Sequence, residues 1–211
     1  MAYDLEEQEQ IDALKAWWQQ YGTLVILGIV VFVVAIAGFF GWRHYKDVQS
    51  REAAIVYGTL GKAIAGKDSA KLKEAAGTLR AKHPGHGYAS LGSLAEGRFH
   101  FETGDLAAAR TALQWVVGNG RDEELRDIAR LRLANVLVDE KKLDEALKAL
   151  DTKPVEPLVA LYADLKGDIL AVQGKAAEAR AAYQLASDKS DAKGSYRSLI
   201  QIKLESLGEA K

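Results

Sequence analysis

The 211-residue chain contains no cysteine. It therefore forms no disulfide, has no thiolate nucleophile and offers no cysteine ligand to a zinc or iron–sulfur site. The absence does not select a cellular compartment, because a cysteine-free domain tolerates both oxidising and reducing surroundings. Beyond the N-terminal apolar stretch the chain also lacks the alternation of apolar and polar residues that indicates half-buried strands, so we expect an all-α fold.

Neither sign of charge dominates, and the formal net charge is −1. Residues 1–22 carry five acids against Lys15, a net of −4, and residues 43–211 carry 27 basic against 24 acidic residues, a net of +3. The basic residues are interspersed with acids rather than gathered on one stretch, which does not match a nucleic-acid footprint. We expect no nucleic-acid partner.

Motifs for catalysis are missing as well: no nucleophile-elbow serine, HExxH or GxGxxG pattern occurs. Residues 61–68 approach a phosphate-binding loop, but Asp68 stands where that motif needs a hydroxyl, and no strand precedes it. His83 and His86 share a Pro-Gly turn, yet two imidazoles do not complete a metal site, and we interpret this turn as exposed. We expect no enzyme activity, no cofactor and no metal.

Residues 23–42 are 20 consecutive residues without a charge, almost all of them apolar, reading TLVILGIVVFVVAIAGFFGW. At about 1.5 Å per residue a helix of this length spans about 30 Å, the hydrocarbon thickness of a bilayer. Trp18 precedes the stretch, and Trp42 and Tyr45 close it, as in the aromatic belts at lipid headgroups. An acidic start and this length are not those of a cleaved signal peptide. We predict a short acidic tail over residues 1–22 and an uncleaved transmembrane helix in contact with membrane lipid.

Small residues cluster near the end of this apolar stretch. Ala37 and Gly41 lie four positions apart, with Gly38 beside them. Small residues at this spacing allow a partner helix to pack closely within the membrane. The plainer interpretation, that they simply face lipid, stays open beside this one.

Residues 43–211 are internally self-similar. An alanine followed four positions later by leucine or tyrosine recurs at Ala109 with Leu113, Ala146 with Leu150, and Ala179 with Tyr183. A small residue stands twelve positions before each alanine, at Gly97, Ala134 and Gly167. Both series advance by 37 and then 33 residues, close to the 34-residue tetratricopeptide period. Small residues allow the two helices of a repeat to approach closely, so we predict a tetratricopeptide-like α-solenoid over residues 43–211.

Such a solenoid exposes a concave face built by the first helix of each repeat. In the usual register this face draws on Arg98, Phe101, Asn135, Val138, Asp164 and Asp168. The mixture of charges and apolar side chains favours a polypeptide ligand. Residues 191–207 are expected to form a terminal capping helix. Its inward side chains are predicted to be Tyr196, Leu199, Ile200 and Leu204, and its outward ones Arg197, Gln201, Lys203 and Glu205.

Three segments of the chain resemble the YfgM family. They read EQIDALKAWWQQYG before an apolar stretch ending in GWR, then LRLANVLVDEKKLDEALKALDT, then DLKGDILAVQGKAAEARAAYQLA. That family comprises ancillary subunits of the SecYEG translocon in Gram-negative inner membranes. The resemblance, which covers essentially the whole chain, implies association with SecYEG and the membrane-anchored chaperone PpiD. It further implies that newly translocated, still unfolded polypeptides are helped towards periplasmic chaperones.

The resemblance also implies a single-pass inner-membrane protein with a cytoplasmic tail and a periplasmic domain. The positive-inside rule argues the other way, because Lys15 precedes the apolar stretch whereas Arg43, Lys46 and Arg51 follow it. Long domains translocate regardless of local charge, so we expect the family orientation. An alternative role implied by the resemblance is a membrane tether that sequesters the cytoplasmic stress regulator RcsB.

Overall fold

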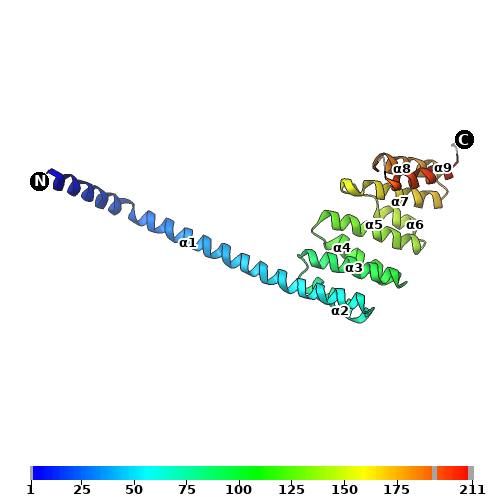
Figure 1. Cartoon of the computed structure of the whole chain (residues 1–211), viewed down its shortest axis with the longest axis horizontal. Coiled ribbons are helices and arrows are strands. Elements are labelled where there is room, and N and C mark those ends of the chain that lie inside the picture. The colour runs from blue at the N-terminus through cyan, green and yellow to red at the C-terminus, as the bar shows by residue number, and fades with distance from the viewer. Residues whose placement is uncertain (1, 192–193, 209–211) are drawn as a thin grey trace. The chain divides into compact units, whose positions relative to one another are not determined.

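The computed structural model describes residues 2–191 and 194–208, with side chains from residue 9 onward in those ranges. Within them every regular element is a helix, which confirms the all-α prediction (Figure 1). The elements are α1 (Ala2–Ala65), α2 (Ser69–Lys82), α3 (Gly87–Glu102), α4 (Leu106–Asn119), α5 (Glu123–Asp139), α6 (Leu143–Ala149), the 3₁₀ helix η1 (Glu156–Leu158), α7 (Val159–Val172), α8 (Ala176–Asp188) and α9 (Ser195–Ser206). The chain divides into two compact units, Met1–Arg51 and Glu52–Lys211.

The first unit consists of the N-terminal part of α1. Its apolar side chains over residues 23–42 are almost all exposed, and the most apolar 18-residue window has a mean hydropathy of 2.9. Apolar side chains exposed all round a helix suit contact with lipid better than contact with water. Within the described part of the chain this is the one helix long and apolar enough to cross a membrane.

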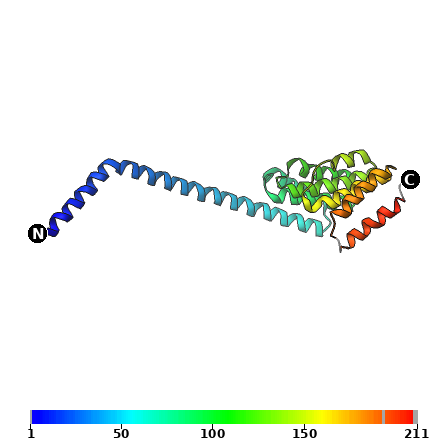
Figure 2. The ribbon, with the colours of Figure 1, turned by 90° about the horizontal axis from the view of Figure 1, so that it is seen from above.

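The second unit stacks helices in the order of the sequence, each packed on the next (Figures 1 and 2). Its core follows the stack as three clusters of buried side chains. The first is built around Leu60, Leu72 and Leu79, the second around Leu113 and Leu150, and the third around Tyr183, Ile200 and Leu204. Core clusters spaced along one axis, with contacts between helices of the same repeat or of the next one, are the architecture of a helical repeat.

Close helix approach at the small residues explains the repeat pattern. A Cβ added at Gly97 would lie 2.9 Å from Leu113 Cγ, and one added at Gly167 would lie 2.5 Å from the Tyr183 ring. Ala134 is fully buried at the same position of the middle repeat. The first and second helices of each pair, α3 with α4 and α7 with α8, thus approach as the repeat spacing predicted.

The turn inside each pair has a left-handed residue at one equivalent position. Gly104 and Gly174 have φ of +83° and +77°, and the middle repeat has Lys141 there with φ of +63°. A left-handed backbone conformation is strained for a residue that has a Cβ, whereas glycine adopts it without strain. The middle turn thus keeps its geometry at an energetic cost that the other two avoid.

Replacing Lys141 by glycine is therefore expected to stabilise the domain by about 0.5–1 kcal/mol. Chemical denaturation of the detergent-solubilised chain, followed by circular dichroism, measures the change. Lys148→Gly is the matched control, because Lys148 lies inside α6 and its loss to glycine should cost about 1 kcal/mol. Destabilisation by both substitutions would contradict the assignment of strain to Lys141.

Two details of the sequence-based interpretation are wrong. In α9 the buried side chains are Ile200 and Leu204, whereas Leu199 is 48% exposed and Lys203 points inward. Lys203 turns in because two carboxylates of α7 lie there to pair with it. The turn before α3 is not wholly exposed either, since His83 is buried, and the backbone N–H of Tyr88 donates to the His86 imidazole, which caps that helix.

Candidate functional site

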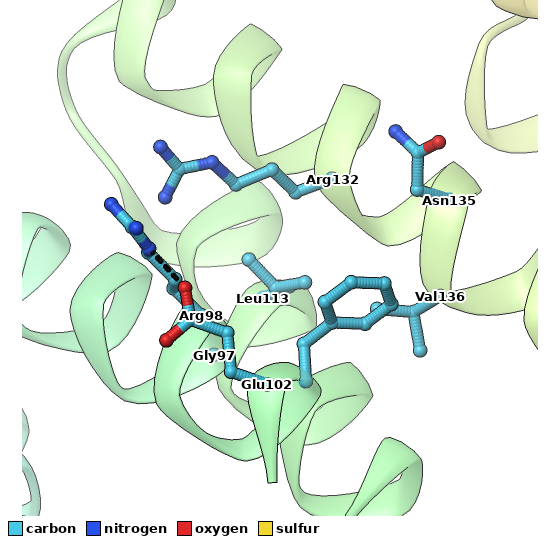
Figure 3. A pocket seen from close by; sticks show the side chains of 8 residues that line it. Gly97, Arg98, Glu102, Leu113, Arg132, Asn135 and Val136 are labelled. Carbon is cyan, nitrogen blue, oxygen red and sulfur yellow. Dashed lines mark hydrogen bonds and ion pairs between the residues drawn. The ribbon is translucent and has the colours of Figure 1, made fainter. Parts of the chain in front are cut away.

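A pocket of about 400 Å³ opens between α3 and α5, the first helices of two consecutive repeats (Figure 3). It is lined by Gly97, Arg98, Phe101 and Glu102 of α3, Leu113 of α4, and Arg132, Asn135 and Val136 of α5. We call it the α3–α5 pocket. Its volume lies in the range of sites that hold a small ligand or a side chain of a larger one.

The floor of the α3–α5 pocket is apolar and rigidly packed. Leu113 and Val136 are each only 1% exposed and belong to the central core cluster. Gly97 leaves room for Leu113 to reach the pocket from the helix behind, because any side chain there would collide with it. Phe101 is 39% exposed and adds an aromatic surface. An apolar ligand side chain placed here would remove its surface from water, and the pocket would not need to rearrange to receive it.

Positive side chains outnumber negative ones in the α3–α5 pocket, since Arg98 and Arg132 face Glu102. Arg98 Nε lies 2.7 Å from Glu102 Oε1, and this bond raises the pKa of Arg98. Arg132 reaches no carboxylate in the described part of the chain, and its Nη1 donates only to the backbone oxygen of Leu94 at 3.4 Å. Burial and the nearby charge of Arg98 lower the pKa of Arg132. Two cations facing one anion leave one positive charge uncompensated.

The structure brings three of the six predicted groove residues together, namely Arg98, Phe101 and Asn135. Val138 lies elsewhere, because it is half-buried and packs against the central core cluster. Sequence reasoning missed Arg132, although it precedes Asn135 by three positions and so shares its helical face. That spacing was the available signal for Arg132.

Asp164 and Asp168, the other two predicted groove residues, lie outside the α3–α5 pocket and are engaged by side chains of the domain itself. Lys203 Nζ of α9 lies 2.8 Å from Asp164 Oδ1 and 2.8 Å from Asp168 Oδ2. The hydroxyls of Tyr196 and Tyr183 donate to Asp164 and Asp168 at 2.9 Å and 2.8 Å. We call these five side chains the α7–α9 network. These two predicted groove carboxylates therefore already have partners in α8 and α9.

The candidate packing residues of the apolar helix lie on an unobstructed surface. Ala37 is exposed, and no atom lies within 4 Å of a Cβ added at Gly38 or Gly41. A partner helix would find room there, and its presence stays a prediction. Among the described residues no group of three histidine, aspartate or glutamate side chains is placed to hold a metal ion.

The fold and the pocket define a class: a tetratricopeptide-type repeat protein with an apolar N-terminal helix and a groove between repeat helices. The family model of the tetratricopeptide repeat-like domain matches residues 15–209. The chain is 30% identical to the ancillary SecYEG translocon subunit of Neisseria gonorrhoeae, over 98% of this chain and 100% of the relative. It is 31% identical to the protein of that name from Escherichia coli K12, over 95% and 96%, and 31% identical to that from Haemophilus influenzae, over 88% and 91%.

The chain therefore belongs to the YfgM family, the ancillary SecYEG translocon subunits. The resemblance inferred from its sequence blocks is confirmed. No solved structure matches the chain.

Proposed function

We propose that the protein is a membrane-anchored, non-enzymatic interaction subunit of the SecYEG translocon. The observation that carries the proposal is the extent of the similarity, which covers 98% of this chain and 100% of a relative named for that role. Similarity over the apolar helix as well as the repeats supports a shared place in the membrane, because both parts would be needed there.

In this role the repeat domain acts as an adaptor. It receives newly translocated, unfolded polypeptides and, together with PpiD, passes them to periplasmic chaperones. The α3–α5 pocket supports a binding role, since it combines an apolar floor with exposed charged and amide groups that a polypeptide can engage. The proposal needs no cofactor.

Crosslinking in intact cells, followed by purification in mild detergent, tests the association. SecYEG and PpiD should be recovered with the wild-type chain. A variant with leucine at Ala37, Gly38 and Gly41 should lose part of this recovery if those residues pack against a partner helix. Gly28→Leu is the matched control, because Gly28 lies in the same apolar stretch and also has no neighbour within 4 Å. Recovery of the wild-type chain free of SecYEG and PpiD would refute the association.

The proposal includes an orientation: a single pass through the inner membrane, with the N-terminus cytoplasmic and the repeat domain periplasmic. Protease added to right-side-out spheroplasts should then digest the chain beyond residue 43. The same protease should leave a cytoplasmic control protein intact until the membrane is broken. Protection of the whole repeat domain in sealed spheroplasts would place it in the cytoplasm and rule out a role in periplasmic delivery.

A second candidate function is a tether that sequesters a cytoplasmic regulator such as RcsB. The observation in its favour is the net charge of −4 on residues 1–22, separated from the repeat domain by the apolar stretch. Deleting residues 1–15 distinguishes the two functions. A change in stress signalling with unchanged recovery of SecYEG would assign regulation to the tail, and unchanged signalling would remove this candidate.

A further inference from the structure

The α3–α5 pocket contains one positive charge that the described chain leaves unpaired. Glu102, the carboxylate that lines the pocket, already pairs with Arg98 at 2.7 Å. Arg132 stands next to this pair and donates only to the Leu94 carbonyl oxygen. A second anion placed beside Arg132 would gain a charge-assisted hydrogen bond and relieve its repulsion with Arg98. The pocket is thus suited to an anionic group.

The planar guanidinium of Arg132 can hold an anion through two parallel hydrogen bonds. Its fork of N–H donors matches the two oxygens of a carboxylate. Beside it the half-exposed ring of Phe101, backed by the buried Leu113 and Val136, can take an aliphatic or aromatic side chain. Asn135 donates one amide hydrogen to the Leu131 oxygen at 3.0 Å, and its exposed amide can still accept from a peptide N–H. Carboxylate, apolar group and peptide N–H occur together in an unfolded polypeptide.

We propose that the α3–α5 pocket binds polypeptide segments in which a large apolar side chain lies beside an internal aspartate or glutamate. The carboxylate pairs with Arg132, and the apolar side chain packs on the exposed ring of Phe101. This selectivity rests on the proposed function, in which the ligand is an unfolded polypeptide. A basic segment fits poorly, because its cation would meet Arg132 and find Glu102 already paired.

Fluorescence anisotropy with the full chain in a non-ionic detergent tests the selectivity. The probe is a labelled ten-residue peptide, blocked at both termini, with a central Asp-Phe-Leu. Asn-Phe-Leu and Asp-Ala-Ala versions remove the carboxylate and the apolar side chains in turn. Wild-type chain should bind the first peptide about 3- to 10-fold more tightly than the asparagine version, and the preference should shrink with added salt.

Substitution of Arg132 assigns the preference to the pocket. Arg132→Gln should abolish the difference between the aspartate and asparagine peptides, and Arg132→Glu should prefer a Lys-Phe-Leu version. Lys148→Gln is the matched control, because it removes one positive charge from the exposed surface of α6, outside the pocket. It should leave the preference unchanged. A cooperative thermal unfolding transition at the wild-type temperature shows that each variant keeps its fold.

Equal binding of the aspartate, asparagine and lysine peptides by wild-type chain would overturn the proposal, as would an aspartate preference that survives Arg132→Gln. Competition by vesicles of anionic phospholipid, with no competition by unlabelled peptide, would also overturn it and assign the site to lipid. Each of these results leaves co-isolation with SecYEG unaffected. Loss of co-isolation with the peptide preference intact would instead refute the proposed place at the translocon.

Discussion

Replacing Gly167 by alanine is expected to lower the free energy of unfolding of the repeat domain by about 1–3 kcal/mol. The added methyl would lie 2.5 Å from the ring of Tyr183, a distance that real Cβ atoms do not reach. Tyr183 cannot easily move aside, because its ring is 4% exposed and its hydroxyl is held by Asp168 at 2.8 Å. The new methyl must therefore push α7 and α8 apart or expel a buried ring.

Gly77→Ala is the matched control for that substitution. Gly77 also lies inside a helix, α2, but no atom is within 4 Å of its added Cβ. There alanine removes only the conformational cost of glycine, so the variant should be stabilised by up to about 1 kcal/mol. Thermal and chemical unfolding of the detergent-solubilised chain measure both. A stabilising effect at Gly167 as well would show that the close approach of α7 and α8 is absent.

Replacing Lys203 by methionine is expected to destabilise the α7–α9 contact by about 1–3 kcal/mol, below the value for a fully buried pair because Asp168 is 41% exposed. The substitution keeps the length of the side chain but leaves Asp164, whose side chain is 11% exposed, without its cation. Amide hydrogen exchange should rise in α9 and change little in α3. Lys148→Met, on an exposed surface of α6, serves as the control. Unaltered exchange in α9 would mean that Lys203 does not hold it.

The α7–α9 network should also weaken in alkali. Burial lowers the pKa of Lys203, but its hydrogen bonds to Asp164 and Asp168 and the negative charges of these two carboxylates together raise it by more, so the net pKa lies above the ordinary 10.5. Stabilisation by this lysine is complete below pH 10.5 and is lost as pH rises through the folded pKa. Burial and then hydrogen bonds to the same aspartates raise the pKa of Tyr183 and Tyr196 above 10.0. Unfolded tyrosines ionise first, so both effects make hydrogen exchange in α9 rise above about pH 10.

The repeat architecture could be predicted because it rests on local spacing. Gly97 and Gly167 contact Leu113 and Tyr183, in each case sixteen positions later, and a solenoid brings that fixed interval together in successive repeats. The left-handed turns at Gly104 and Gly174 could be predicted because glycine adopts a positive φ without strain. Lys141 holds the same geometry, because the packing of the two flanking helices imposes it against the preference of lysine.

The candidate site was less accessible to sequence reasoning. Arg98 and Asn135, which the register of the repeat assigned to one face, line the same pocket. Lys203 was assigned to the outer face because an amphipathic pattern treats a lysine as solvated, whereas a carboxylate 39 positions earlier draws it inward. A contact at that separation leaves no periodic trace in one sequence. The same limit hid the importance of Arg132. Its charge is unpaired because the Glu102 carboxylate pairs with Arg98 instead.

Site-specific photo-crosslinking in living cells tests most directly whether the groove of the repeat domain receives translocating polypeptides. A photoreactive residue is placed at Asn135, in the α3–α5 pocket, or at Lys148, exposed on α6 outside it. A secretory polypeptide stalled in SecYEG should then crosslink strongly at position 135 and weakly at position 148. Equal yields at the two positions, or a crosslink at position 148 alone, would contradict the account.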